Sequence, residues 1–401
     1  MLCRITHKGI TLSSIEVAAI AIVGYLVFLP LETQPDLATM MMVTFGFLAV
    51  FSHKKFRPRL DRLDYFVISL IIAITYISSL LSVDPGRSFR FMVYLCLNVF
   101  LLVLATAMIS RKSLKIIAGF LGLLGVVHLV TLLITSQLAD PATASSLIKQ
   151  SQLATLIVPN DALVLGLCFP SLALISLNND FKTPIIPFAG LTLYVALAVY
   201  ISYLLQSKVT ILSLAAAVLS MTVAWVVFPL RENLGKHRIT VMVGTFSLLL
   251  ALCISAWYLG NQSTTRLSLW SFASTAHTSI SEVFLGSGPN TFLYNPNAIE
   301  SEFDRGDLII PWAHNLYLEA YYDQGLFGLL GLLALTITPL VRALKIQDRA
   351  ISAALFASII TFILVALVEI TLTRRFYFAF LVIMYGLSKA QASEAITCSK
   401  K

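Results

Sequence analysis

Residues 311–335 read PWAHNLYLEAYYDQGLFGLLGLLAL, and the stretch changes from polar to apolar part-way along. His314, Glu319 and Asp323 lie in its first half, whereas no charged side chain follows Gln324 within it. A helix over residues 315–341 is long enough to cross a hydrocarbon core of about 30 Å. We therefore predict a transmembrane helix that begins close to His314, with its polar end at the membrane interface.

The composition of the whole chain agrees with this interpretation. Hydrophobic residues make up 58% of the 401 residues, charged residues make up 12%, and the mean hydropathy is +0.87. These values lie outside the range of soluble proteins. We expect an all-α, polytopic membrane protein that forms a single integral membrane domain over residues 1–401, with about 12 transmembrane helices. The predicted spans are 14–31, 37–52, 63–82, 91–110, 114–135, 152–177, 185–205, 208–229, 239–259, 315–341, 350–371 and 376–389.

The basic residues predict the orientation. Roughly 20 of the 28 Lys and Arg residues fall in alternate connections and at the two termini, and such residues concentrate on the cytoplasmic side. Both termini are then cytoplasmic, and the large connection over residues 260–314 faces the periplasm of a bacterial inner membrane. The basic residues form no aromatic-interleaved patch, so nucleic-acid binding is not expected. The five cysteines lack metal-ligand spacing, which predicts neither zinc nor a disulfide.

A smaller set of cations lies on the predicted outer side, against this bias. Any one of them could be an interfacial residue or an ion-pair partner of Glu32, Asp84 or Glu369. Together, beside a histidine and a large loop, they favour an anionic ligand such as a phosphate. The set consists of Arg87, Arg90, Lys149, Lys208, Arg266, Arg305, Arg374 and Arg375.

The outer connection contains two recognisable local patterns. Residues 266–276, which include Arg266 and Trp270, could form an amphipathic surface helix. GSGPN at residues 286–290 predicts a turn; without a preceding strand or a following Lys-Ser/Thr it is weak evidence for phosphate binding. His277 is interpreted as a solvated or capping residue.

His314 has two possible roles at the start of its helix. The positive end of the helix dipole favours the neutral imidazole, which can accept a proton. Asn315 could instead cap the helix and leave His314 as an interface residue. Position alone does not separate the two.

Three separated pieces of the chain carry a family resemblance. QSKVTILSLAAAVL begins at Gln206 and has Lys208 where the family commonly has arginine. TRLSLW is followed by VFLGSGPNTF, and AHNLYLEAYYDQGLFGLLG comes third. Over roughly residues 191–340 these resemble the lipopolysaccharide O-antigen ligases and their relatives, the O-antigen polymerases and protein O-oligosaccharyltransferases.

The resemblance implies a GT-C-like glycosyltransferase that moves O-antigen from undecaprenyl diphosphate to lipid A-core on the periplasmic face, among membrane lipids. With this chemistry, His314 is the expected general base and Arg266 is catalytic. The candidates for binding the diphosphate are Lys208, Arg266 and one of Arg374 or Arg375. Glu319 would orient His314 or Arg266, with Asn315, Trp270 and Gly288 in support. No Asp-x-Asp pair lies in an outer loop, so we expect neither metal nor cofactor.

Two other functions remain open. An O-antigen polymerase is the second choice, because residues 136–151 offer only Lys149 where polymerases tend to have an arginine-rich loop. A soluble C-terminal domain, usual in the protein O-oligosaccharyltransferases, is not expected, since the chain stops soon after its last span. A transporter or flippase of lipid-linked glycans is less favoured, because such proteins place charges near the bilayer midplane.

Overall fold

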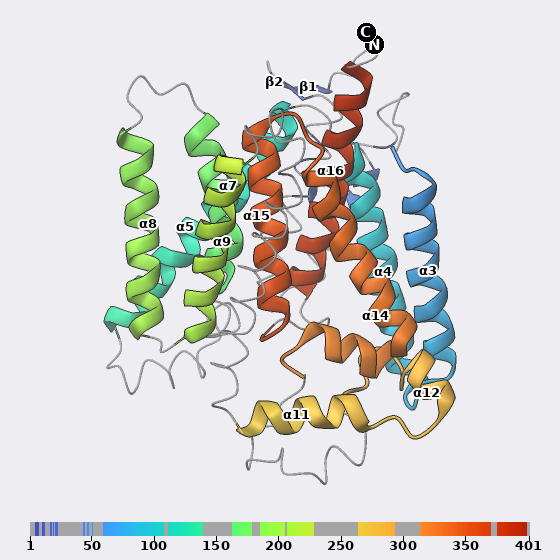
Figure 1. Cartoon of the computed structure of the whole chain (residues 1–401). Helices are drawn as coiled ribbons and strands as arrows, with labels where there is room; N and C mark the ends of the chain where they lie inside the picture. The colour runs from blue at the N-terminus through green and yellow to red at the C-terminus, as the bar shows by residue number, and fades with distance from the viewer. Residues whose placement is uncertain are drawn as a thin grey trace.

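The computed structural model describes most of the chain from residue 59 onward (Figure 1). Earlier residues are described only at scattered positions and in a short antiparallel hairpin of β1 (Ile5–His7) and β2 (Ile10–Leu12). The described ranges are 59–107, 111–138, 163–178, 185–204, 207–227, 264–292, 313–369 and 375–398.

Helices dominate these ranges. Seven of them are long and apolar enough to cross a membrane: α3 (Arg62–Leu80), α4 (Pro85–Thr106), α5 (Arg111–Leu138), α8 (Ile185–Leu204), α9 (Lys208–Val227), α14 (Leu316–Ala343) and α15 (Arg349–Ala366). The described helices also include α7 (Val164–Asn178), α16 (Arg375–Cys398) and the short α11 (Thr264–Thr275) and α12 (Ile280–Leu285). The helical, membrane-spanning class predicted from the sequence is therefore confirmed.

Most predicted spans correspond to observed helices. Every predicted span from residue 63 onward overlaps a helix, apart from 239–259, which lies outside the described residues. The spans 14–31 and 37–52 are described only at isolated positions, so the number of twelve stays a prediction. The hairpin at residues 5–12 is a feature that the hydropathy pattern did not predict.

Local capping chemistry sets where several helices begin. Asp61 and Asp64 form a capping box at the start of α3: the Asp64 amide donates to Asp61 Oδ1 at 3.0 Å, and the Asp61 amide donates to Asp64 Oδ2 at 2.8 Å. Asp84 caps α4 directly before Pro85, and Asp348 accepts two amides at the start of α15. These side chains satisfy amides that have no partner within the helix.

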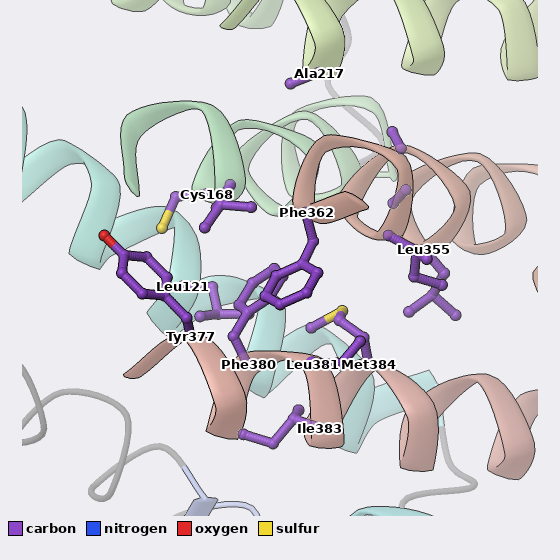
Figure 2. Packing of buried hydrophobic residues seen from close by; sticks show 14 of the residues in the cluster. Leu121, Cys168, Ala217, Leu355, Phe362, Tyr377, Phe380, Leu381, Ile383 and Met384 are labelled. Atoms are coloured by element: carbon purple, nitrogen blue, oxygen red, sulfur yellow. The ribbon is translucent and has the colours of Figure 1, made fainter. Parts of the chain in front are cut away.

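The core of the bundle lies around α15 and α16. Most of the apolar length of α15 is buried, and Phe362 of this helix stacks on Phe380 of α16 with ring centroids 6.3 Å apart. Figure 2 shows these rings beside Leu121, Cys168 and Met384, so side chains from α5, α7 and α16 meet here. Neighbouring α9 packs along α15 in the opposite direction, since the Arg349 guanidinium at the start of α15 donates to the Trp225 carbonyl near the end of α9.

A buried ionic network joins three helices at one end of the bundle. Arg342 of α14 donates to Asp64 Oδ1 of α3 at 2.5 Å, and Tyr385 of α16 donates to the same oxygen at 2.7 Å. Lys389 of α16 contacts both Asp61 and Asp64. Asp64 is fully buried, so removal of one cation would leave a costly unpaired charge.

The structure corrects the prediction of one continuous helix over residues 315–341. At Gly325 the backbone has φ 65° and ψ −163°, which breaks α14 into two helical parts. Figure 1 shows the first part lying across the end of the bundle and the second part rising through it. The physical reason is close packing: a Cβ at Gly325 would lie 2.3 Å from the backbone of Phe284 in α12. The spanning part of α14 therefore begins after Gly325.

Helices α11 and α12 lie at the same end of the bundle as the first part of α14 (Figure 1). The β1–β2 hairpin and the last turns of α16 lie at the other end. We name these the α11 end and the hairpin end. The ionic network of Asp61, Asp64, Arg342 and Lys389 belongs to the hairpin end, and His314 belongs to the α11 end.

Candidate functional site

His314 is held by a carboxylate that is distant in the chain. Its Nδ1 atom lies 3.1 Å from Oε1 of Glu369, which directly follows the last turn of α15. The Glu369 side chain is only 5% exposed and that of His314 is 13% exposed. With the carboxylate ionised, Nδ1 is the donor in this pair, because an ionised carboxylate only accepts hydrogen bonds. In the neutral imidazole, Nε2 then carries the lone pair.

His314 also has an unusual backbone. Its φ is 52°, in the left-handed region that non-glycine residues rarely adopt. Such strained residues persist where the surrounding structure holds them, and they cluster at functional sites. The residue stands directly before the N-cap of α14.

Asn315 is that N-cap. Its Oδ1 accepts hydrogen bonds from the Tyr317 and Leu318 amides at 3.0 and 3.1 Å. The structure therefore confirms that Asn315 caps the helix, which the sequence offered as the alternative to a functional His314. The cap leaves the His314 side chain available for other contacts, since Asn315 satisfies the helix while His314 contacts Glu369.

Trp270 fixes α11 to the backbone beside His314. Its indole Nε1 donates to the Ala313 carbonyl at 3.0 Å. Trp270 belongs to a small apolar cluster that is separate from the main core and joins α11 to the first part of α14; its buried members are Leu269, Trp270, Ala273, Phe292, Ala313 and Tyr322. This contact fixes the chain immediately before His314, and the supporting role of Trp270 in a reaction stays a prediction.

GSGPN is the predicted turn, and Asp323 holds it in place. The Asp323 carboxylate accepts the amides of Asn290 at 2.8 Å and Thr291 at 3.3 Å. Gly288 has φ 113° and donates its amide to the Asp323 carbonyl at 2.9 Å. A Cβ at Gly288 would lie 2.0 Å from Ser82 Oγ, so glycine is required by space as well as by conformation.

The same turn docks on the connection between α3 and α4. Ser88 Oγ donates to the Pro289 carbonyl at 2.9 Å, and the Val83 amide donates to the Ser287 carbonyl at 3.1 Å. Asp323 is therefore a support for the GSGPN turn. Sequence alone did not show what Asp323 binds.

The structure gives His314 a carboxylate partner other than Glu319, and the orienting role of Glu319 toward His314 or Arg266 stays a prediction. Glu319 is buried one turn into α14, and the carboxylate found on the His314 ring is that of Glu369. The sequence indicates Glu369 only as a possible ion-pair partner for an outer cation.

Two of the predicted cations lie at helix starts. Lys208 is exposed at the first position of α9, and Arg375 is the first residue of α16. Since α9 and α15 run in opposite directions, Lys208 lies at the same end of the bundle as Glu369. Arg266 lies in α11 one turn before Trp270, and Arg374 lies outside the described residues. Whether the side chains of Arg266, Arg374 and Arg375 converge on His314 stays a prediction.

Two other residues of this end have mainly structural contacts. His277 approaches the Tyr322 carbonyl with Nε2 at 3.1 Å and stacks on the Tyr322 ring. Arg87 lies 3.8 Å from Asp84, as the ion-pair interpretation of an outer cation expected. Within the described ranges, His, Cys, Asp and Glu side chains do not gather in threes as a metal site would require.

No protein-family model matches this chain, and no curated protein has significant sequence similarity to it.

Proposed function

We propose that this protein is a membrane glycosyltransferase that transfers O-antigen from undecaprenyl diphosphate to the lipid A-core oligosaccharide. In this proposal the α11 end faces the periplasm of a bacterial inner membrane, and the hairpin end faces the cytoplasm. The basic loops support this orientation.

The observation that carries the proposal is the pair of His314 and Glu369. A histidine whose Nδ1 proton is bound by a buried carboxylate keeps its Nε2 lone pair directed elsewhere, which is the arrangement of a general base. The pair lies where α14 begins and α15 ends, at the end of a multi-pass bundle. A base at this boundary suits a reaction between a sugar in water and a lipid-bound donor.

In the proposed reaction the acceptor hydroxyl oxygen attacks the anomeric carbon of the donor sugar. Its proton moves to Nε2 of His314, and the bond between the anomeric carbon and the diphosphate oxygen breaks with both electrons on the diphosphate. Glu369 stabilises the imidazolium that forms. One displacement inverts the anomeric configuration, and no glycosyl-enzyme intermediate is required.

The leaving diphosphate needs positive charge, and four basic residues are the candidates to supply it. Lys208 begins α9 and Arg375 begins α16, so each adds a cation to the positive end of a helix dipole. Arg266 of α11 and Arg374 are the further candidates for phosphate contact. Arg266 is proposed to stabilise the charge that develops on the leaving group.

An O-antigen polymerase is the second candidate, because it would use the same donor and the same base. A deletion strain separates the two by the pattern of its lipopolysaccharide. We expect bare core together with accumulated long lipid-linked chains, which indicates a ligase. Core carrying one repeat unit would indicate a polymerase, and wild-type lipopolysaccharide would contradict both.

A further inference from the structure

Helix α12 presents an apolar face that the proposed reaction does not use. Ile280 is 80% exposed, and Phe284, one helical turn later, is also exposed. Residues four apart lie on the same face of a helix, so these two side chains point the same way. The sequence predicted an amphipathic surface helix over residues 266–276, and α12 lies outside that range.

The opposite face of α12 is polar and tightly bonded. Glu282 and Ser279 form a capping box, and Glu282 Oε2 also accepts the Thr278 amide at 2.7 Å. That hydrogen bond holds the pKa of Glu282 below its ordinary value, so its carboxylate is charged near neutral pH. An amphipathic helix can lie in the plane of a membrane interface with its apolar face among the acyl chains.

The apolar face continues onto helices that span the bilayer. Phe284 packs on Phe327 of α14, with ring centroids 5.4 Å apart, and Phe327 and Leu330 are themselves exposed. On the other side, Leu81 and Val83 are exposed at the end of α3, where the Val83 amide binds the Ser287 carbonyl just after α12. Figure 1 shows α12 beside the lower ends of α3 and α14.

We propose that α12 lies in the lipid interface at the α11 end, with Ile280 and Phe284 among the acyl chains. The bilayer is the partner that this face fits, because the exposed apolar sides of α3 and α14 must already contact lipid and α12 extends the same surface. The Gly325 break and the Asp323 contacts connect α12 rigidly to α14. Insertion of α12 therefore sets the depth of the first part of α14, which begins beside His314.

Photocrosslinking in intact cells tests this inference without any measurement of activity. The full-length protein carries p-benzoylphenylalanine at Ile280, and cells are grown with radiolabelled phosphate so that phospholipids carry the label. Ser281, exposed on the next position of the same helix, is the matched control site. After illumination and denaturing purification, we expect several-fold more label on the protein with the probe at Ile280 than at Ser281.

Three results would overturn the inference. Label at Ile280 that is as low as at Ser281 would place Ile280 outside the acyl chains. An unlabelled adduct of higher mass at Ile280 would show that another protein or a second copy covers this face. No adduct at Ile280, when a probe at the exposed Leu330 of α14 does react with lipid, would place Ile280 in water. None of these results bears on the glycosyltransferase proposal.

Discussion

Nδ1 of His314 lies 3.1 Å from Oε1 of Glu369, although 55 residues separate the two in the chain. The pair exists because the start of α14 and the end of α15 meet at the same end of the bundle. Both side chains are largely buried, so the contact is a stable feature of the fold and not a loose surface pair.

Replacing Glu369 with glutamine should slow the reaction without much change in substrate binding. The amide can no longer stabilise an imidazolium, and it can hold the ring in the wrong tautomer. We expect kcat to fall at least about tenfold with KM for the lipid-linked donor nearly unchanged. Asp84→Asn is the control, because it alters a carboxylate of the same end and keeps the cap of α4. Equal kinetics for Glu369→Gln and wild type would refute the positioning role.

Replacing Trp270 with phenylalanine should loosen the backbone before His314. The Ala313 carbonyl is left without its indole donor, and an unsatisfied buried carbonyl costs about 1–3 kcal/mol. We expect a lower melting temperature in detergent and a reduced transfer rate. Trp225→Phe removes an indole at the other end of the bundle and should leave the rate intact; an equal loss of rate in both variants would argue against a local effect.

Replacing Gly325 with alanine should destabilise the protein strongly. Its backbone conformation is open essentially to glycine only, and a Cβ would meet the backbone of α12, so a loss of about 3 kcal/mol or more is expected. Gly190→Ala is the matched control, since a Cβ there meets no atom within 4 Å. Size-exclusion after graded heating measures both, and a Gly325→Ala protein as stable as Gly190→Ala would contradict the break in α14.

Local chemistry accounts for what could be predicted from sequence. Uninterrupted apolar runs predicted the spans, Asn315 before an apolar helix predicted a cap, and GSGPN predicted a turn. Each of these depends on residues that are neighbours in the chain. The position of Trp270 near His314 came from the resemblance, and the structure supplies its hydrogen bond.

The features that could not be predicted depend on contacts between distant segments. A glycine within an apolar run is usually tolerated in a helix, and only the backbone of α12 makes Gly325 a break. In retrospect, the change from polar to apolar residues in the stretch 311–335 falls at this glycine. In sequence, Glu369 looks like any acidic residue near the end of a span. Nothing in the residues around it indicates a contact with His314.

The network at the hairpin end should give stability that depends on acid pH. Burial alone would raise the pKa of Asp61. The hydrogen bond and ion pair with Lys389, the hydrogen bond from the Asp64 amide and the charge of Arg342 outweigh burial, and the pKa falls from 3.8 to about 2. A lowered pKa means that the stabilisation is present above about pH 4 and is lost as the pH falls toward 2. Asp61→Asn keeps the helix cap but removes the charge of Asp61. The difference in melting temperature between wild type and this variant should therefore shrink as the pH falls from about 4 toward 2. A difference that is constant with pH would contradict the ion pairs.

The most direct test of the account is the transfer rate of His314→Ala. Purified protein in lipid nanodiscs is given undecaprenyl-diphosphate-linked O-antigen and lipid A-core, and the initial rate is compared at equal amounts of folded protein. His277→Gln, which retains a donor for the Tyr322 carbonyl, serves as the control. We predict that His314→Ala lowers the rate by about 10²–10⁴-fold while His277→Gln stays near wild type. Transfer by His314→Ala at the wild-type rate would show that the base lies elsewhere.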